Sequence, residues 1–122
     1  GSGLTDARTR LVRADAIAWV ESCQETFDLI VIDFTKEPLE SFWSVQVYKR
    51  IKQLLNPGGA LMQSVGTMKM PMGVRNSFGL HAAVFDRVYA LSTMVPDYSS
   101  PYLMAFSGDT LNPFEVDWGF WR

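Results

Sequence analysis

The sequence predicts an α/β domain in which a mostly parallel sheet, flanked by helices, closes with an antiparallel hairpin. Apolar runs of strand length alternate with helical patterns along residues 9–85. A Pro-Gly-Gly turn at 57–59 separates the clearest helix from the strand that follows it. Two more apolar runs, 87–95 and 100–108, flank a short break and predict the hairpin. This alternation favours a parallel sheet with right-handed crossovers.

Composition limits the chain to one domain. It has 122 residues, 48% of them hydrophobic, enough for one continuous core. We interpret residues 1–3 as a cloning scar and residues 4–122 as the domain. The net charge of -2, without a basic cluster, argues against a nucleic-acid partner. One Cys and one His leave neither a disulfide framework nor a metal cluster. We expect no membrane partner and a cytoplasmic location.

The elements follow in order from these patterns. Residues 9–16 alternate and predict a strand that runs into a helix, whose apolar stripe includes Trp19 and Cys23. Residues 27–34 form a short, nearly continuous apolar run, as expected for a strand covered on both faces. Ser44 can cap the next helix, which the Pro-Gly-Gly turn ends. A third strand (60–65), a Met-rich loop (66–73) and a weaker helix (74–85) complete the pattern.

Polar residues end several of these strands. Asp15, Asp33 and Gln63 each fall at the carboxyl end of an expected strand, next to the Met-rich loop. In open parallel sheets ligands bind outside the carboxyl ends of the strands. The sequence therefore predicts a ligand site at this end of the sheet.

The order of motifs resembles the spermidine synthase family of polyamine aminopropyltransferases. The matching segments are RLVRADAIAWV, FDLIVIDFT, WSVQVYKRIKQLLNPGGALMQSV and VPDYSS, within residues 6–108. The resemblance implies a partial Rossmann-like fold of the class I methyltransferase type. It also implies an aminopropyl transfer from decarboxylated S-adenosylmethionine to a diamine, with methylthioadenosine as the nucleoside product.

The resemblance assigns roles to individual residues. Asp15, with Ala16 beside it, matches the position that recognises the adenine amino group, and a carboxylate can accept that hydrogen bond. Asp15 can equally cap the helix that starts at Ala16. Asp33 matches the catalytic aspartate, which holds or removes the proton of the attacking amine. The alternative is that Asp33 only ends the strand and bonds the turn backbone.

Two more positions complete the implied site. Tyr98 matches a tyrosine that positions the amine, or is a plain turn aromatic. Gln63 matches a polar residue near the nucleoside pocket, or is an exposed strand end. The sequence departs from the family after Asp33, where Lys36 stands at the place of a second acid unless Glu37 fills it. A lysine there repels a cationic diamine, so the amine specificity stays open.

The family's glycine-rich cofactor turn, and the acid that holds the ribose, have no counterpart here. We therefore expect a partial or degenerate aminopropyltransferase-like domain, inactive alone, that forms a homodimer or higher oligomer to cover open strand edges. One alternative is a non-catalytic oligomeric interaction protein on the remnant fold. Another is a fragment of an S-adenosylmethionine-dependent methyltransferase, which would take S-adenosylmethionine instead.

Overall fold

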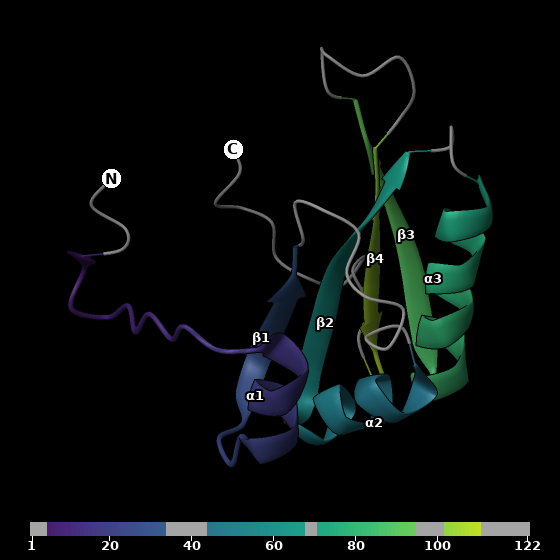
Figure 1. The fold of residues 1–122 in the computed structure, drawn as a ribbon. Coiled ribbons are helices and arrows are strands. Elements are labelled where there is room, and N and C mark those ends of the chain that lie inside the picture. The colour runs from purple at the N-terminus through teal and green to yellow at the C-terminus, as the bar shows by residue number, and fades with distance from the viewer. Residues whose placement is uncertain (1–4, 34–43, 68–70, 95–101, 111–122) are drawn as a thin grey trace.

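The computed structural model describes residues 5–33, 44–67, 71–94 and 102–110. Three helices and four strands alternate along these segments (Figure 1). They are α1 (Ala16–Ser22), β1 (Phe27–Ile32), α2 (Val45–Gln53), β2 (Leu55–Thr67), α3 (Pro71–Val84), β3 (Arg87–Thr93) and β4 (Tyr102–Gly108).

The strands form one sheet in the order β1-β2-β4-β3. β1 pairs with β2 in parallel, and β4 pairs antiparallel with both β2 and β3. Three strands therefore share one direction and only β4 opposes them, which confirms the predicted fold class. The antiparallel pairing of the last two strands is also confirmed, although the last strand lies inside the sheet and β3 lies at its edge.

The strand expected at residues 9–16 is wrong. Residues 9–15 belong to no strand or helix, and α1 begins at Ala16. A strand exists only where a neighbour completes its hydrogen-bond ladder. Within the described residues, β1 pairs with β2 alone, so residues 9–15 form no ladder with β1.

Helix α2, which connects β1 to β2, begins where the sequence predicts. Ser44 caps α2, because its Oγ accepts a hydrogen bond from the Val47 amide at 3.3 Å. β2 starts at Leu55, earlier than expected, so the Asn-Pro-Gly-Gly turn lies within its first residues. There the register against β1 shifts, because Phe27 pairs with Leu55 whereas Leu29 pairs with Ala60.

Gly59 explains why this turn needs glycine. A Cβ at Gly59 would lie 2.9 Å from the carbonyl oxygen of Asn56 and 3.1 Å from that of Asp28. The neighbouring Gly58 has a φ of 79°, in the left-handed region that favours glycine. The Pro-Gly-Gly turn therefore lets the first residues of β2 approach β1, at the end of the sheet opposite Asp33.

The Met-rich loop is shorter than expected. β2 continues through Thr67 and α3 begins at Pro71, so only residues 68–70 separate them, and these lie outside the described residues. A proline suits the first turn of a helix, where its missing N–H has no intrahelical partner. α3 therefore starts before the expected Val74.

The hydrophobic core lies between the three helices and one face of the sheet. Alternate residues point to this face, including Ile30 and Ile32 of β1 and the fully buried Leu61 of β2. The other residues of β1, Leu29 and Val31, point the opposite way and are 51% and 56% exposed. Within the described residues, α1, α2 and α3 all pack against the same core cluster.

Candidate functional site

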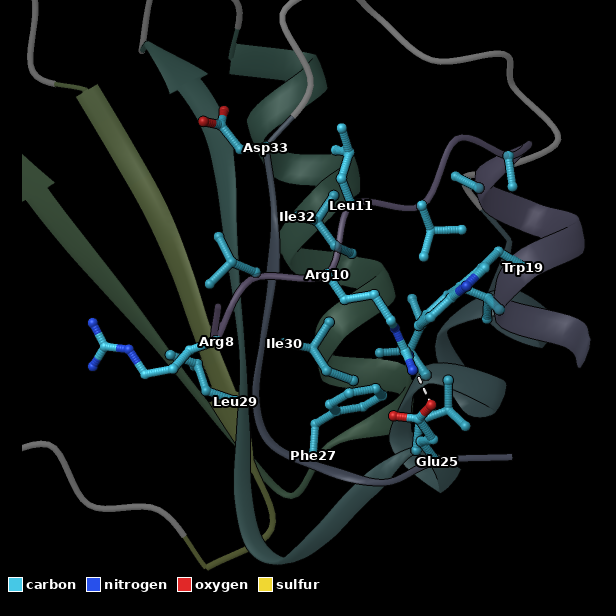
Figure 2. Close-up of a pocket in the computed structure, with 17 residues that line it drawn as sticks. Arg8, Arg10, Leu11, Trp19, Glu25, Phe27, Leu29, Ile30, Ile32 and Asp33 are labelled. Carbon is cyan, nitrogen blue, oxygen red and sulfur yellow. Dashed lines mark hydrogen bonds and ion pairs between the residues drawn. The ribbon is translucent and has the colours of Figure 1, made fainter. Parts of the chain in front are cut away.

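A groove runs beside β1 and ends at Asp33. It lies between β1, α1 and the segment before α1, with a volume of about 840 Å³ (Figure 2). That volume is within the range of small-molecule pockets. Most of the lining is apolar: Leu11, Val12, Ala14, Ala16, Trp19, Val20, Phe27, Leu29, Ile30, Val31, Ile32, Ile51 and Leu54. The charged lining residues are Arg8, Arg10, Glu25 and Asp33.

Asp33 immediately follows the last residue of β1. Figure 2 shows its carboxylate at the carboxyl end of the strand, and the side chain is exposed. The parallel ladder places Ile32 beside Gln63 of β2, so Asp33 emerges one residue beyond that pair. The strand thus presents a solvated carboxylate at the predicted ligand end of the sheet.

Asp15 caps α1. Its Oδ1 accepts a hydrogen bond from the Ala18 amide at 3.0 Å, which confirms the capping role that the sequence allows. The side chain is exposed, and the residues on either side, Ala14 and Ala16, line the groove. Asp33 therefore lines the groove at the end of β1, and the two neighbours of Asp15 line it at the start of α1.

Arg50 of α2 fixes the position of α1. Its guanidinium donates hydrogen bonds to the carbonyl oxygens of Val20 at 3.1 Å and Cys23 at 2.6 Å. Val20 lies in the last turn of α1 and Cys23 is its C-cap, so neither carbonyl has an intrahelical partner. A cation at a helix C-terminus is also favoured by the helix dipole. The position of Asp15 thus depends on a side chain that the sequence analysis did not single out.

Gln63 lies in the core and does not line the groove. It is fully buried, so the expectation of an exposed strand end is wrong. Its Oε1 accepts a hydrogen bond from the Tyr48 hydroxyl at 2.8 Å and lies 2.6 Å from His81 Nε2. The other imidazole nitrogen, Nδ1, lies 2.6 Å from the hydroxyl oxygen of the buried Ser107. These four side chains form a buried network across α2, β2, α3 and β4.

The hydrogen bonds and the burial of His81 together favour a neutral imidazole. An amide oxygen only accepts, so the Nε2 that faces Gln63 Oε1 carries the proton. The Ser107 hydroxyl can donate to Nδ1 when the ring is neutral. Burial disfavours the charged form and lowers the pKa of His81 to about 4. Burial likewise raises the pKa of Tyr48 above its ordinary value, against the opposing effect of its hydrogen bond to Gln63.

One polar atom of this network has no partner. The amide nitrogen of Gln63 is buried and makes no hydrogen bond in the described structure. A buried donor without an acceptor is costly, by about 1–3 kcal/mol. The network therefore satisfies the amide oxygen twice and leaves the amide nitrogen unpaired.

Sequence reasoning found part of this arrangement. It placed Asp33 at the carboxyl end of β1 and allowed Asp15 as a helix cap, but it did not join His81 to Gln63. The sequence feature that could have revealed this contact is the presence of polar side chains on otherwise apolar faces. Tyr98, Lys36 and Glu37 lie outside the described residues.

Neither a metal-binding cluster nor a membrane-spanning helix occurs among the described residues. They contain no group of three or more His, Cys, Asp or Glu side chains that could hold a metal ion. Among the same residues, no helix has the length and apolar character needed to cross a membrane.

The sequence matches known aminopropyltransferases over most of its length. The family model of the spermine/spermidine synthase domain matches residues 1–117. The polyamine aminopropyltransferase of Thermoplasma volcanium is 30% identical over 117 residues, which are 92% of this chain and 43% of that protein. The chain therefore spans less than half of this curated relative.

Solved structures show the same fold. The spermidine synthase of Thermotoga maritima superposes with a TM-score of 0.82 at 18% identity, over 91% of this chain and 38% of that one. A spermidine synthase in complex with the transition-state analogue AdoDATO gives a TM-score of 0.79 at 18% identity, with 91% and 37% covered. An O-methyltransferase of Klebsiella pneumoniae gives 0.53 at 18% identity, with 77% and 47% covered. With this methyltransferase-like fold and the family match, the chain belongs to the spermine/spermidine synthase domain family.

Proposed function

We propose that this chain supplies the adenine-recognition and amine-activation side of an aminopropyltransferase site. The observation that supports this proposal is a shared groove. Asp33 lines it at the end of β1, and Ala14 and Ala16, the neighbours of Asp15, line it at the start of α1. A chain that places Asp33 and the neighbours of Asp15 beside one apolar cavity can hold a nucleoside and an amine next to each other. The transfer reaction itself is proposed only for the site completed by the rest of an aminopropyltransferase chain.

The lining residues fit part of decarboxylated S-adenosylmethionine. A flat, largely apolar base suits a groove wall that includes Trp19 and Ile51, and the Asp15 carboxylate can accept a hydrogen bond from an exocyclic amine. The ribose has no acidic partner in the matched motifs. We therefore propose that this chain alone binds methylthioadenosine weakly and does not complete the reaction.

Asp33 acts on the amine in this proposal. When bound, the sulfonium substrate supplies an electrophilic methylene carbon and a neutral thioether leaving group. Attack on that carbon needs an uncharged amine, because only the uncharged form has a free electron pair. The Asp33 carboxylate holds the amine and accepts the proton that it loses, as the new carbon–nitrogen bond forms and the carbon–sulfur bond breaks. Tyr98 is proposed to position the amine, and Gln63 to support the nucleoside side from the core.

Calorimetry with methylthioadenosine tests the nucleoside half. We expect Asp15→Asn to weaken binding by about tenfold, because an amide oxygen replaces a charged acceptor. Asp33→Asn should leave this binding unchanged, since the role proposed for Asp33 concerns the amine. Asp28→Asn is a matched control, because Asp28 lies at the opposite end of β1 and bonds Asn56.

The outcomes separate the remaining alternatives. Absence of heat with both methylthioadenosine and S-adenosylmethionine would contradict the proposal and favour a non-catalytic interaction protein. Tighter binding of S-adenosylmethionine than of methylthioadenosine would favour a methyltransferase fragment. Equal loss in the Asp15 and Asp28 variants would show that charge alone, and not the position of Asp15, controls binding.

A further inference from the structure

Helix α3 is buried most deeply toward its C-terminal end. Among the side chains of α3 that the structure describes, from Arg75 onward, the first buried one is His81, and Val84 follows it. Every residue between Arg75 and Leu80 is exposed or half-buried. Figure 1 shows the helix running back along the sheet from the end of β2. His81 is therefore the first buried side chain that the described part of the helix reaches after it leaves β2.

The end of α3 has contacts that do not involve His81. Lys52 of α2 donates a hydrogen bond from Nζ to the Val84 carbonyl oxygen at 3.0 Å, and it forms an ion pair with Asp109 at 2.9 Å. Asp109 in turn accepts a hydrogen bond from the Asp86 amide at 3.1 Å. The buried Phe85 ring packs in the core cluster, and Lys52 Nζ lies 5.9 Å from its centroid. This end of the helix is thus held by α2 and by the residue that follows β4.

The first part of α3 reaches the polar centre of the core through His81. The imidazole lies 2.6 Å from Gln63 Oε1 on β2 and 2.6 Å from Ser107 Oγ on β4. Its ring centroid is 5.2 Å from that of Tyr48 on α2 and 6.2 Å from that of Phe85. The polar groups that face the imidazole from α2, β2 and β4 are therefore a phenol, an amide and a hydroxyl.

This surrounding suits a neutral ring and opposes a charged one. A protonated imidazole donates from both nitrogens, so Ser107 Oγ would have to accept a hydrogen bond at Nδ1. No carboxylate in the described segments contacts the ring to offset the charge, and the Lys52 ammonium above Phe85 repels a second cation. Protonation therefore favours a His81 side chain that has left the core for water.

We propose that the first part of α3, up to His81, is a segment that acid releases from the sheet. When His81 takes up a proton its side chain leaves the core, and the contacts of Lys52 and Phe85 keep the end of the helix in place. Such an opening of one segment needs less free energy than unfolding of the whole domain. Because Gln63 pairs with Ile32, the release uncovers the core next to the carboxyl end of β1.

This conformational change does not depend on the proposed transfer reaction. It concerns contacts within the described fold, and its test contains no nucleoside or amine. A failure of the test is therefore distinguishable from a failure of the proposed function.

Amide hydrogen exchange at pH 7 and pH 5 tests the release, with protection taken relative to the intrinsic exchange rate at each pH. The pKa of His81 is about 4 while the ring is docked and about 6.5 once it is in water, so the docked form loses stability as the pH falls between these values. We expect the protection of residues 75–80 to fall by about twentyfold from pH 7 to pH 5. These amides should also depend less steeply on urea than those of β2, because a local opening exposes little surface.

Two results would overturn the proposal. The first is a protection of residues 75–80 that does not fall between pH 7 and pH 5. The second is an exchange of these residues with the same protection and the same urea dependence as β2 at pH 5, because the helix would then open only when the whole domain unfolds.

Substitutions at the contact show whether His81 controls the release. Gln63→Glu places a carboxylate against Nε2, so a protonated His81 gains a partner of opposite charge. The protection of residues 75–80 should then be no lower at pH 5 than at pH 7. His81→Leu removes the titrating group and should also abolish the fall. Thermal unfolding of each variant checks that the fold is retained.

Lys52→Met is the matched control, because it removes the contacts at the other end of α3. It should lower the protection of residues 82–85 by a similar factor at both pH values. The twentyfold fall for residues 75–80 should remain, to about the same size as in the unchanged chain. A fall that persists in His81→Leu, or one that disappears only in Lys52→Met, would contradict the release by His81.

Discussion

His81 Nε2 lies 2.6 Å from Gln63 Oε1 in the buried core, so a helix and the central strand β2 are joined by a hydrogen bond that only a protonated Nε2 can donate. The hydroxyl oxygen of Ser107, on the neighbouring strand β4, lies 2.6 Å from the other imidazole nitrogen, Nδ1. A neutral imidazole satisfies both partners at once, and its protonation would require the Ser107 hydroxyl to turn from donor to acceptor.

The free energy of unfolding should therefore depend on pH through His81. The pKa of His81 is about 4 in the folded chain and 6.5 in the unfolded chain, so the unfolded chain binds the extra proton between these values. Stability should fall as pH decreases from about 6.5 to about 4, by up to about 1.4 kcal/mol per pH unit, and this contribution should level off below pH 4. Urea unfolding at pH 5 to 7 measures the slope. His81→Leu should flatten it, and an unchanged slope in that variant would contradict the assignment.

Loss of the Ser107 hydroxyl should destabilise the fold. Ser107→Ala leaves His81 Nδ1 as a buried acceptor without a donor, at a cost of about 1–3 kcal/mol. Ser92→Ala, on the exposed part of β3, is the matched control and should change stability little. Denaturant unfolding of both variants measures the difference. Equal stability of the two would mean that the Ser107 contact contributes nothing measurable.

Two glycines should respond oppositely to alanine. Gly59→Ala places a methyl group 2.9 Å from the Asn56 carbonyl oxygen and 3.1 Å from that of Asp28, so β2 must move away from β1. We expect a loss of about 1–3 kcal/mol. Gly79 lies within α3 with nothing within 4 Å of an added Cβ, so Gly79→Ala should stabilise by about 0.5–1 kcal/mol. Thermal unfolding midpoints that shift in the same direction would contradict this contrast.

Removal of the Arg50 guanidinium should loosen α1. Arg50→Met keeps much of the side-chain volume but loses the hydrogen bonds to Val20 and Cys23. Amide exchange in α1 should speed up by about tenfold or more, and methylthioadenosine should bind more weakly because Asp15 moves with the helix. Lys49→Met, an exposed neighbour on α2, is the control. Unchanged exchange in α1 would show that core packing alone fixes the helix.

The chain alone is predicted to self-associate. Sedimentation at micromolar concentration should show a homodimer or a higher oligomer, because an open apolar strand edge favours pairing. Leu29→Lys with Val31→Lys should shift it to a monomer. A monomeric wild-type chain at that concentration would contradict the prediction.

The sequence predicted elements where local chemistry decides the structure. Ser44 at the start of α2 carries its own capping signal and caps the helix as expected, whereas the Pro-Gly-Gly turn, expected between helix and strand, lies within β2. The segment containing Leu11 was misassigned because its alternation satisfies the pattern of a strand but says nothing of a partner. A ladder of inter-strand hydrogen bonds needs two segments, so the periodicity of one segment cannot predict it.

The same limit applies to the candidate site. Asp33 was placed correctly after β1 because a strand end can be located from an apolar run, whereas the strand that was expected to end at Asp15 does not form. The contact between His81 and Gln63 spans two elements whose faces the sequence leaves undetermined. Arg50 was missed for a similar reason, since its partners are backbone carbonyls that carry no residue-specific signal.

The order of the strands also constrains how the chain can be assembled during synthesis. β3 pairs with no described strand except β4, which follows β3 in the sequence and lies between β3 and β2 in the sheet. Until residue 108 has left the ribosome, β3 has no described partner strand, and His81 in α3 lacks the Ser107 hydroxyl. The described sheet therefore cannot close in the order in which its strands are translated, because β3 joins β2 only through β4.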